Sequence, residues 1–456
     1  MKKLFLIFTI FICSNIYPCT KLVFFDELPV SDFFGNYCEN IEVGFGAVVY
    51  AQDAIDENAL FSSPDIGIAT TGIVDNKPLE EEKKSVGFSG EITSVVNYTD
   101  TRDWINYILG NFFIDTRLKK GTKGFTSIET KYTSESDTTN LTLKELFLDF
   151  NIKNKVYFRT GKQVIQWGRC YLWNPTDLIN VEKKTFTEKI GAREGAYGIK
   201  THIPFGAKLN IYSFIDTGKT SAADSTAVAS KIEFLVGNTE MAFAVWGKKG
   251  FKPVYGYDFS TRLFKIDTYG ELAASHGDNY DKMAIENGML VKSKSSNKWN
   301  PRASIGFNKS FDFRDVNDRI TTTCEFYYNR AGYKENVFSD AAVYPYQEPI
   351  ANFDSTGTKK EFLLGNNLYE MNSLSKYYAA LFASYKKFII SDLTLNMNLI
   401  GNLNDNSFIL SSGVNYQDLT DFNIGLTVYS YLGPSNREYT FLGSAINTQL
   451  TVGIIF

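Results

Sequence analysis

The sequence has little of what several common protein classes require. Among its 456 residues there are 2 His and 11 Pro, and after the first residues no apolar run reaches the about 18 that a membrane-spanning helix needs. The 47 basic and 51 acidic residues leave a formal net charge of −4. Because nucleic-acid binding generally needs a basic surface, nucleic acid is not an expected partner. A bundle of membrane-spanning helices is not expected either.

Cysteine and histidine form no recognisable chemical site. The five cysteines are scattered without a C-x-x-C pair, so they predict neither a zinc site nor a disulfide framework. One bridge between Cys38 and Cys170 is left open. His202 and His276 stand in no catalytic motif such as G-x-S-x-G. We therefore expect no enzymatic activity, no bound metal and no cofactor.

The first residues have the layout of a secretory signal peptide. Lys2 and Lys3 precede an apolar run from Leu4 to Cys13, which is too short to span a membrane as a helix. We assign residues 1–18 to this signal and expect an exported protein. Residues 19–85 follow as an acidic, mixed segment. This segment is interpreted as a periplasmic extension or a plug that enters a barrel, with extra strands as the third alternative.

What the sequence has in abundance is aromatic residues and alternation. It contains 37 Phe and 27 Tyr, which favour strands over helices. The last stretch, Ala445 to Phe456, sets a mostly apolar row against a small, polar one. Only a β-strand places such rows on opposite faces, and about 9 to 11 residues suffice for a tilted strand to cross a bilayer. The apolar row consists of Ile446, Thr448, Leu450, Val452, Ile454 and Phe456.

Similar runs recur from Val86 onward, and eighteen can be counted. Charges on one face and apolar residues on the other suit a barrel in lipid, whereas a soluble sandwich would bury the apolar face. Connectors such as Leu263 to Ile266 are short and alternate with long ones. The expected fold is an all-β, transmembrane antiparallel β-barrel over residues 86–456, with about 18 strands (16–20), short periplasmic turns and long extracellular loops. The long connectors are Gly168–Glu194, Gly277–Lys298, Arg330–Lys376 and Gly433–Ser444.

The chain ends on an aromatic residue. A strand closed by Phe456 resembles the assembly signal of Gram-negative outer-membrane β-barrels. The resemblance implies a bacterial outer-membrane location and insertion into its lipid by the barrel assembly machinery. The terminal Phe456 would be the residue that this machinery recognises. The oligomeric state stays open.

The most distinctive stretch runs from Leu143 to Glu182. Within it stand G-K-Q-V-I-Q-W-G at residues 161–168 and N-P-T-D at residues 174–177. Here the chain resembles a family of uncharacterised Gram-negative outer-membrane porins with the signature G-[RK]-Q-x-x-x-W-G followed by N-P-x-D. It is also loosely similar to alginate-export-type barrels. The matching residues are Gly161, Lys162, Gln163, Trp167, Gly168, Asn174, Pro175, Asp177 and Leu178.

Physical reasoning gives these residues a structural role first. Asn174 and Asp177 flank Pro175 in a way that suits a turn, with side chains able to bond to nearby backbone. Gly161 lets another part of the chain approach a strand closely. The first interpretation is therefore a folded loop scaffold at the mouth of the barrel. The second is a direct ligand role, for Gln163, Trp167 or Asp177.

The expected function is an outer-membrane porin-like channel for the passive diffusion of small solutes. Residues 151–200 hold ten Lys or Arg against four acidic residues, so a basic constriction at Arg159 would favour anions. The alternative is that these basic residues lie on a solvent-exposed loop face and confer no ion selectivity. A different function, binding or adhesion, would use long extracellular loops such as Arg330–Lys376. The candidate lumen residues are Arg117, Glu129, Lys131, Glu145, Asp149, Arg159, Gln163 and Glu325.

Overall fold

A computed structural model describes residues 85–101, 103–118, 121–180, 195–218, 226–295, 297–314, 316–350, 354–417, 421–441, 443 and 445–456. The predicted signal peptide and residues 19–84 lie outside this part of the chain. Eighteen strands form one sheet. They are β1 (Ser85–Thr99), β2 (Trp104–Arg117), β3 (Lys123–Thr133), β4 (Thr138–Ile152), β5 (Val156–Gln163), β6 (Ala196–Phe205), β7 (Leu209–Asp216), β8 (Ala227–Val236), β9 (Thr239–Lys248), β10 (Val254–Leu263), β11 (Ile266–His276), β14 (Trp299–Phe313), β15 (Val316–Asn329), β18 (Tyr377–Tyr385), β19 (Leu393–Asn402), β20 (Ser407–Gln417), β21 (Phe422–Leu432) and β22 (Ile446–Ile455).

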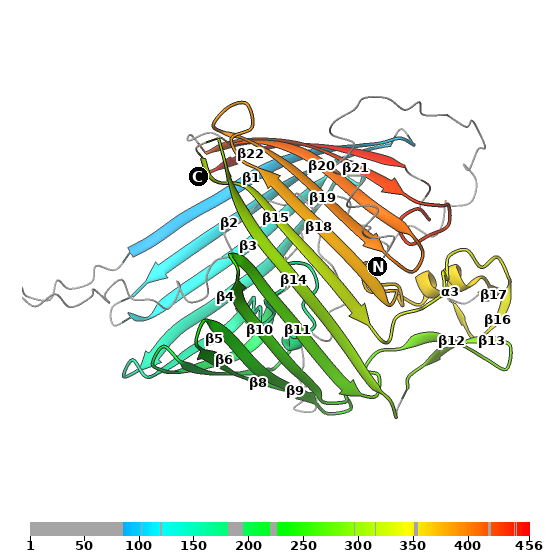
Figure 1. The fold of residues 1–456 in the computed structure, drawn as a ribbon, viewed down its shortest axis with the longest axis horizontal. Coiled ribbons are helices and arrows are strands. Elements are labelled where there is room, and N and C mark those ends of the chain that lie inside the picture. Colours follow the sequence, from blue (N-terminus) through cyan, green and yellow to red (C-terminus); the bar gives the residue numbers. More distant parts are fainter. Residues whose placement is uncertain are drawn as a thin grey trace, which may run out of the picture. The chain divides into compact units, whose positions relative to one another are not determined.

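The sheet closes on itself into a barrel (Figure 1). Neighbouring strands are antiparallel throughout, and β1 pairs with β22, with Val96 opposite Leu450. Strand β11 pairs with β14, and β15 with β18, although long loops separate them in the chain. Closure leaves no strand edge with unpaired backbone groups, which is what a sheet in lipid requires. The predicted antiparallel barrel with about 18 strands is confirmed.

Side chains alternate between the lumen and the outer face of the barrel. In β22, Asn447 and Gln449 are each 1% exposed, whereas Leu450 and Ile454 on the other row are 40% and 48% exposed. Exposed apolar rows of this kind recur around the barrel. Apolar side chains therefore point outward and polar ones inward, as in a barrel surrounded by lipid.

The two ends of the barrel differ in their connections. At the end where the chain stops, which we name the turn end, strands are joined by short turns. The β10–β11 turn holds Phe264 and Lys265 at φ values of 50° and 65°, as a two-residue hairpin turn requires. The opposite end, named the loop end, carries the long connections, in agreement with the asymmetry expected from the sequence.

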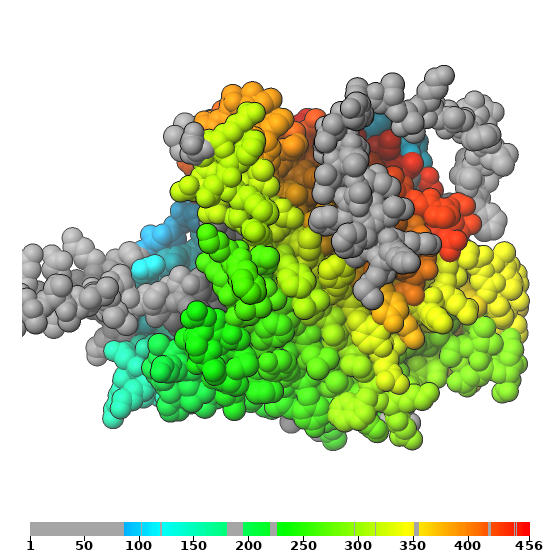
Figure 2. All heavy atoms as spheres, in the orientation of Figure 1, coloured from blue at the N-terminus to red at the C-terminus, as the bar shows by residue number. Residues whose placement is uncertain are grey.

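Two loops at the loop end fold into a small module. It contains β12 (Lys282–Glu286), β13 (Met289–Ser293), β16 (Tyr344–Ile350), β17 (Asp354–Gly357) and α3 (Lys359–Gly365). The sequence predicted no elements here, because these strands are short. Leu290, Phe362 and Leu363 are buried in the core of the module, and Thr358 and Glu361 form a capping box on α3. Its light-green and yellow atoms lie together beside the barrel (Figure 2).

The terminal Phe456 lies at the seam that closes the barrel. Its backbone N–H donates to Gly90 O at 2.9 Å, and Gly90 N–H donates back to Phe456 O at 2.8 Å. The ring of Phe456 lies 5.9 Å from that of Phe88 and 6.4 Å from that of Phe112. Within the described residues, no helix has the length and apolar character to cross a membrane.

Candidate functional site

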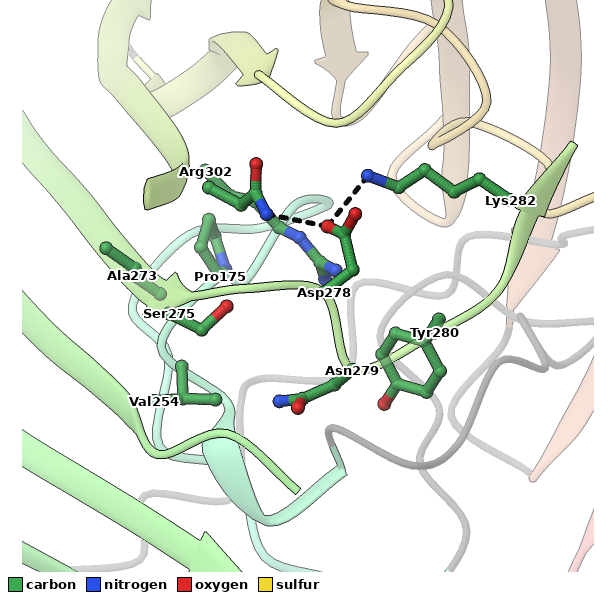
Figure 3. Close-up of a pocket in the computed structure, with 11 residues that line it drawn as sticks. Pro175, Val254, Ala273, Ser275, Asp278, Asn279, Tyr280, Lys282 and Arg302 are labelled. Atoms are coloured by element: carbon green, nitrogen blue, oxygen red, sulfur yellow. Dashed lines mark hydrogen bonds and ion pairs between the residues drawn. The ribbon is translucent and has the colours of Figure 1, made fainter. Parts of the chain in front are cut away.

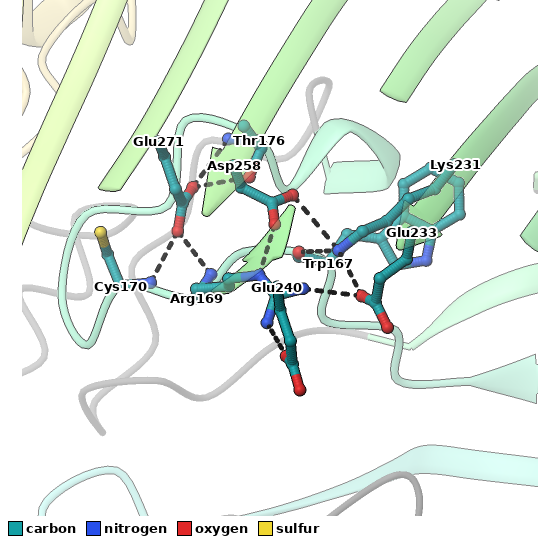
Figure 4. A network of polar contacts seen from close by, with 9 residues as sticks. All are labelled: Trp167, Arg169, Cys170, Thr176, Lys231, Glu233, Glu240, Asp258 and Glu271. Carbon is teal, nitrogen blue, oxygen red and sulfur yellow. Dashed lines mark hydrogen bonds and ion pairs between the residues drawn. The ribbon is translucent and has the colours of Figure 1, made fainter. Parts of the chain in front are cut away.

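The loop between β5 and β6 folds into the barrel. Its described part, residues 164–180, is named the inner loop, and ends in a short 3₁₀ turn over Leu178–Asn180. The inner loop contacts inward-facing side chains of strands from β8 to β18. Figure 4 shows the contacts with residues of β8 to β11. Such a segment narrows the lumen, so it is the candidate site for solute passage.

Two carboxylates of the wall bind the inner loop by its backbone. Glu271 of β11 accepts from the N–H groups of Arg169 and Cys170, both at 2.6 Å, and from Thr176 N at 2.9 Å and Thr176 Oγ1 at 2.8 Å. One side chain therefore joins both arms of the loop. Backbone N–H groups gathered in a turn make a concave anion site, and here that site holds a carboxylate of the protein itself.

Glu325 of β15 binds the tip of the inner loop in the same way. It accepts from the backbone N–H groups of Tyr171, of Leu172 at 2.9 Å and of Trp173 at 3.3 Å, and it is fully buried. Glu325 was predicted from the sequence as a lumen residue. It lies in the barrel interior, and its carboxylate holds the loop.

A charged network fixes the entry of the inner loop. Arg169 forms ion pairs with Asp258 at 2.5 Å, Glu240 at 2.5 Å and Glu233 at 2.8 Å. Lys231 donates to the carbonyl oxygen of Trp167 at 2.9 Å and lies 3.3 Å from Asp258. Hydrogen bonds to ionised partners are the stronger ones, so this network resists displacement of the loop.

Apolar packing complements the network. Trp167 and Leu178 belong to a buried cluster that includes Ala229, Ala244 and Trp246 of the wall. Small side chains on the inner wall make room for the loop. At Gly256 of β10, a Cβ atom would meet Thr176 and Leu178 at 3.3 and 3.5 Å.

The tip of the inner loop reaches the loops of the loop end. The indole N–H of Trp173 donates to Asn372 O at 2.8 Å, and its ring stacks on Tyr327 at 5.5 Å. Tyr171 meets Phe382 of β18 edge-on at 4.8 Å. The inner loop is thus fixed at both ends and at its tip.

The signature residues lie in and below this loop. Gly161 has a φ of 125°, and a Cβ atom there would collide with the carbonyl of Leu146, so the close approach is real. Lys162 donates to Leu143 O at 2.6 Å. Pro175 lines a pocket described below.

The expected turn around Pro175 is present, but the Asn174 side chain does not bond to nearby backbone as predicted. Asp177 N–H donates to Asn174 O at 3.1 Å. The Asn174 amide packs against Gly168, where no Cβ would fit, and makes no hydrogen bond to the described residues.

Cys170 is a free thiol that accepts from Ser304 Oγ at 3.1 Å, so it is not bridged. Cys38 lies outside the described residues.

Several predicted lumen residues support the base of the inner loop. Arg159 and Asp149 form a two-pronged pair at 2.7 and 2.9 Å and are both buried. Glu145 accepts from the backbone N–H of Val164 at 2.8 Å. Gln163, fully buried, donates to the carbonyl of Arg159 at 3.2 Å.

The other predicted lumen residues lie on strands away from the inner loop. Glu129 pairs with Lys144 at 2.9 Å, both 29% exposed in their side chains. Lys131 lies over the ring of Tyr107 at 4.9 Å. Arg117 lies 3.9 Å from Asp115 near the turn end and is the most exposed of the set.

Sequence reasoning missed four central side chains of the network: Arg169, Lys231, Asp258 and Glu271. Lys231, Asp258 and Glu271 stand on polar rows of predicted strands, a signal shared by many residues. The two histidines do not join the network. His202 bonds Asn210 at 3.1 Å and stacks on Tyr212, and His276 lies against Trp299.

Another buried carboxylate, that of Glu438, joins several loops of the loop end by hydrogen bonds. Glu438 accepts from Asn372 N at 2.9 Å, Tyr378 Oη at 2.8 Å and Asn402 Nδ2 at 2.6 Å, while its own N–H donates to Asp405 at 2.8 Å. Burial raises the pKa of Glu438 to about 8, and the nearby Asp405 charge acts in the same direction.

A pocket at the loop end lies beside the inner loop (Figure 3). Pro175 lines it together with Asp278, Lys282 and Arg302. Lys282 and Asp278 pair at 2.8 Å. The Arg302 guanidinium makes no hydrogen bond or ion pair with a described residue, although the carboxylates of Glu370 and Asp278 attract its charge from a longer distance. This positive charge lines the pocket that a solute would enter. No group of side chains in the described part of the chain could hold a metal ion.

Comparison with known proteins identifies the class of fold. No protein-family model matches the chain, and neither does any curated protein. Among solved structures, Acinetobacter baumannii OccAB1 is similar with a TM-score of 0.50 and 8% identity, over 82% of this chain and 97% of that one. At this identity the likeness shows the fold alone: a closed 18-stranded barrel like those of the Occ and OprD porins.

Two further structures match over similar lengths. Pseudomonas aeruginosa OccK2, solved in complex with glucuronate, has 9% identity and a TM-score of 0.49, over 81% of this chain and 98% of that one. Pseudomonas aeruginosa OprD has 9% identity and a TM-score of 0.47, over 83% and 97%. These comparisons do not confirm the predicted signature or the likeness to alginate-export-type barrels.

Proposed function

We propose that the protein is an outer-membrane porin-like channel through which small solutes diffuse passively. The observation that carries this proposal is the inner loop, held inside a closed barrel by Glu271 and Glu325. A barrel of about 18 strands is wide enough for an aqueous lumen, and an inward loop sets its bore. The apolar outer rows fit lipid, and OccAB1 has the same fold.

Planar bilayers test the channel directly. Purified full-length protein should give discrete conductance steps. An electrically silent barrel, inserted and resistant to added protease, would contradict the proposal. The outer-membrane location is part of the proposal: the protein should fractionate with outer-membrane vesicles, and removal of Phe456 should slow its insertion by the assembly machinery.

We further propose a preference for anions at the loop end. The support is Arg302, whose guanidinium lines the pocket beside Lys282 and forms no ion pair with a described residue. Replacing Arg302 with Gln should move the reversal potential in a KCl gradient toward cation selectivity, because one positive charge is lost from the pocket. Arg262→Gln is the matched control, since Arg262 already pairs with Asp267 at 2.5 Å near the turn end. Equal shifts for both variants would refute the preference.

The folded module at the loop end supports a second role in binding a partner outside the cell. Its own core and capped helix give it a fixed surface, unlike a plain loop. Replacing residues 340–365 by a short Gly-Ser linker separates the roles. Loss of partner binding with unchanged conductance supports adhesion, whereas changed conductance assigns the module to the pore.

A further inference from the structure

Five cationic side chains lie with aromatic rings in two neighbouring turns of the turn end. The turns join β14 to β15 and β18 to β19, and Ile320 of β15 pairs with Tyr385 of β18. The Arg319 guanidinium lies 5.1 Å from the ring of Tyr385 and 5.9 Å from that of Phe313. We name this group the rim patch. Its cations are Lys309, Arg314, Arg319, Lys386 and Lys387, and its rings are Phe311, Phe313, Tyr385 and Phe388.

One cation of the rim patch, Lys309, faces the outside of the barrel. Lys309 stands on the outward row of β14 between Phe307 and Phe311, which are 37% and 43% exposed. Its ammonium lies 5.0 Å from the ring of Phe311, the neighbour nearer the turn. A cation on a lipid-facing row is costly unless it reaches the interface and meets an opposite charge. The position of Lys309 therefore points to an anionic partner in the surrounding lipid.

Among the residues that the structure describes, no carboxylate forms an ion pair with the rim patch. Arg319 instead donates to three backbone carbonyls, those of Lys386 at 3.3 Å, Lys387 at 2.8 Å and Phe313 at 3.4 Å. These bonds fix the guanidinium in place but leave its charge uncompensated.

Two of the described acidic residues in these turns bond elsewhere. Asp312 accepts from the backbone N–H of Asp318 at 2.9 Å, and Asp392 accepts from Ser391 Oγ at 2.8 Å. In the adjacent β10–β11 hairpin, by contrast, Arg262 is paired with Asp267. Within the described residues, the rim patch thus differs from this neighbouring hairpin.

The β18–β19 turn adds an apolar tip beside the cations. Ile389 is 83% exposed with a φ of 65°, a conformation that a β-branched residue rarely adopts, and Ile390 is 49% exposed. Exposed aliphatic residues next to Lys386 and Lys387 suit a membrane interface, where headgroups meet hydrocarbon, better than open water. This feature favours a lipid headgroup as the source of the anion over free phosphate.

We propose that the rim patch binds the phosphodiester of an anionic phospholipid in the leaflet at the turn end. The guanidinium groups of Arg314 and Arg319 suit the phosphate oxygens, and Lys309, Lys386 and Lys387 add positive charge around them. The inference rests on the proposed function only in that it places the barrel in a membrane.

Native mass spectrometry of the detergent-solubilised protein, with phosphatidylglycerol and phosphatidylethanolamine in equal amounts, tests this site. Wild-type protein should retain phosphatidylglycerol preferentially. The triple variant Lys309→Gln, Arg314→Gln, Arg319→Gln should lower that preference by at least about tenfold, since each interfacial cation contributes to the attraction. The double variant Lys386→Gln, Lys387→Gln keeps the Arg319 side chain and should lower it by a smaller factor.

The matched control is Lys155→Gln, Lys208→Gln, Lys265→Gln, which removes three exposed charges from other turns of the same end. An equal loss in control and triple variant, or full retention in both rim-patch variants, would overturn the site. Conductance of the same preparations keeps the two proposals apart. A silent barrel that still selects phosphatidylglycerol contradicts the channel alone, and a conducting barrel without lipid preference contradicts the site alone.

Discussion

Two parts of the inner wall use charged residues differently. On β10, β11 and β15, beside the inner loop, Asp258, Glu271 and Glu325 are at most 4% exposed and bind atoms of the loop. On β3 and β4, Glu129 and Lys144 are each 29% exposed in their side chains and pair with each other instead. The first set has exchanged water for backbone N–H and guanidinium groups, and the second set still faces solvent.

The difference separates residues that hold the pore from residues that a solute meets. A buried carboxylate whose lone pairs are occupied has little left to offer a passing ion. A partly exposed ion pair is screened by solvent and salt, and contributes little to stability. Inward position alone, which is what the sequence pattern reports, does not distinguish the two.

The largest expected effect comes from the carboxylates that bind the loop. Replacing both Glu271 and Glu325 by Gln retains shape but removes the charges to which the N–H groups of six residues donate. We expect larger, noisier conductance and a loss of about 2–4 kcal/mol in the free energy of unfolding, measured by urea denaturation in detergent. Glu286→Gln, which alters an exposed hairpin residue of the module, should change neither. Unchanged conductance in the double variant would mean that the inner loop does not set the bore.

A smaller effect, dependent on pH, is expected from Glu438 at the loop end. Its folded pKa of about 8 lies above its ordinary value of 4.5, so the folded loops retain its proton between these values. The stability that Glu438 contributes is therefore present below about pH 4.5 and is lost as pH rises through 8, by up to about 1.4 kcal/mol per pH unit. Hydrogen exchange of residues 433–441 measures it.

The control for that experiment is Glu438→Gln, which is neutral at every pH. Exchange in this variant should be independent of pH after correction for the intrinsic rate. Asp405, Tyr378 and Tyr439 face Glu438, and Asp405→Asn should lower its pKa because one neighbouring negative charge disappears. A pH dependence that persists in Glu438→Gln would assign the effect to another group.

The smallest effect on conductance and stability is expected from the partly exposed residues of the inner wall on β3 and β4. Lys131→Gln removes a charge that lies over the ring of Tyr107. Ion selectivity should shift slightly toward cations, and stability should change by less than about 0.5 kcal/mol. Reversal potential and denaturation midpoints measure both. A stability loss as large as that of the Glu271 and Glu325 variant would erase the distinction between the two walls.

Much of the barrel could be predicted from the sequence, because lipid outside and water inside impose alternation on every strand. The exceptions have physical reasons. The first half of β2 departs from the alternation, since Tyr107 and Leu109 are apolar on the inward row. The strands of the module are only four to seven residues long.

The candidate site was predictable only in part. The signature located the inner loop and its base, including Gly161, Gln163 and Trp167. It did not identify the partners that hold the loop, since Arg169 and Asp258 are 89 positions apart in the chain. Register within a strand follows from local pattern, whereas contact between a loop and a distant wall depends on the closed shape of the barrel. Arg159 illustrates this limit: its inward direction followed from parity, but its buried pair with Asp149 did not.

The hydrogen bonds from main-chain N–H groups to Glu271 and Glu325 bear on how the sequence of the inner loop can vary. A hold on the peptide backbone is indifferent to which side chain each position bears, save where proline would delete the donor. Substitutions at residues 171–173 would therefore leave these backbone bonds in place, and their effect would fall on the packing of Tyr171 against Phe382 and of Trp173 against Tyr327.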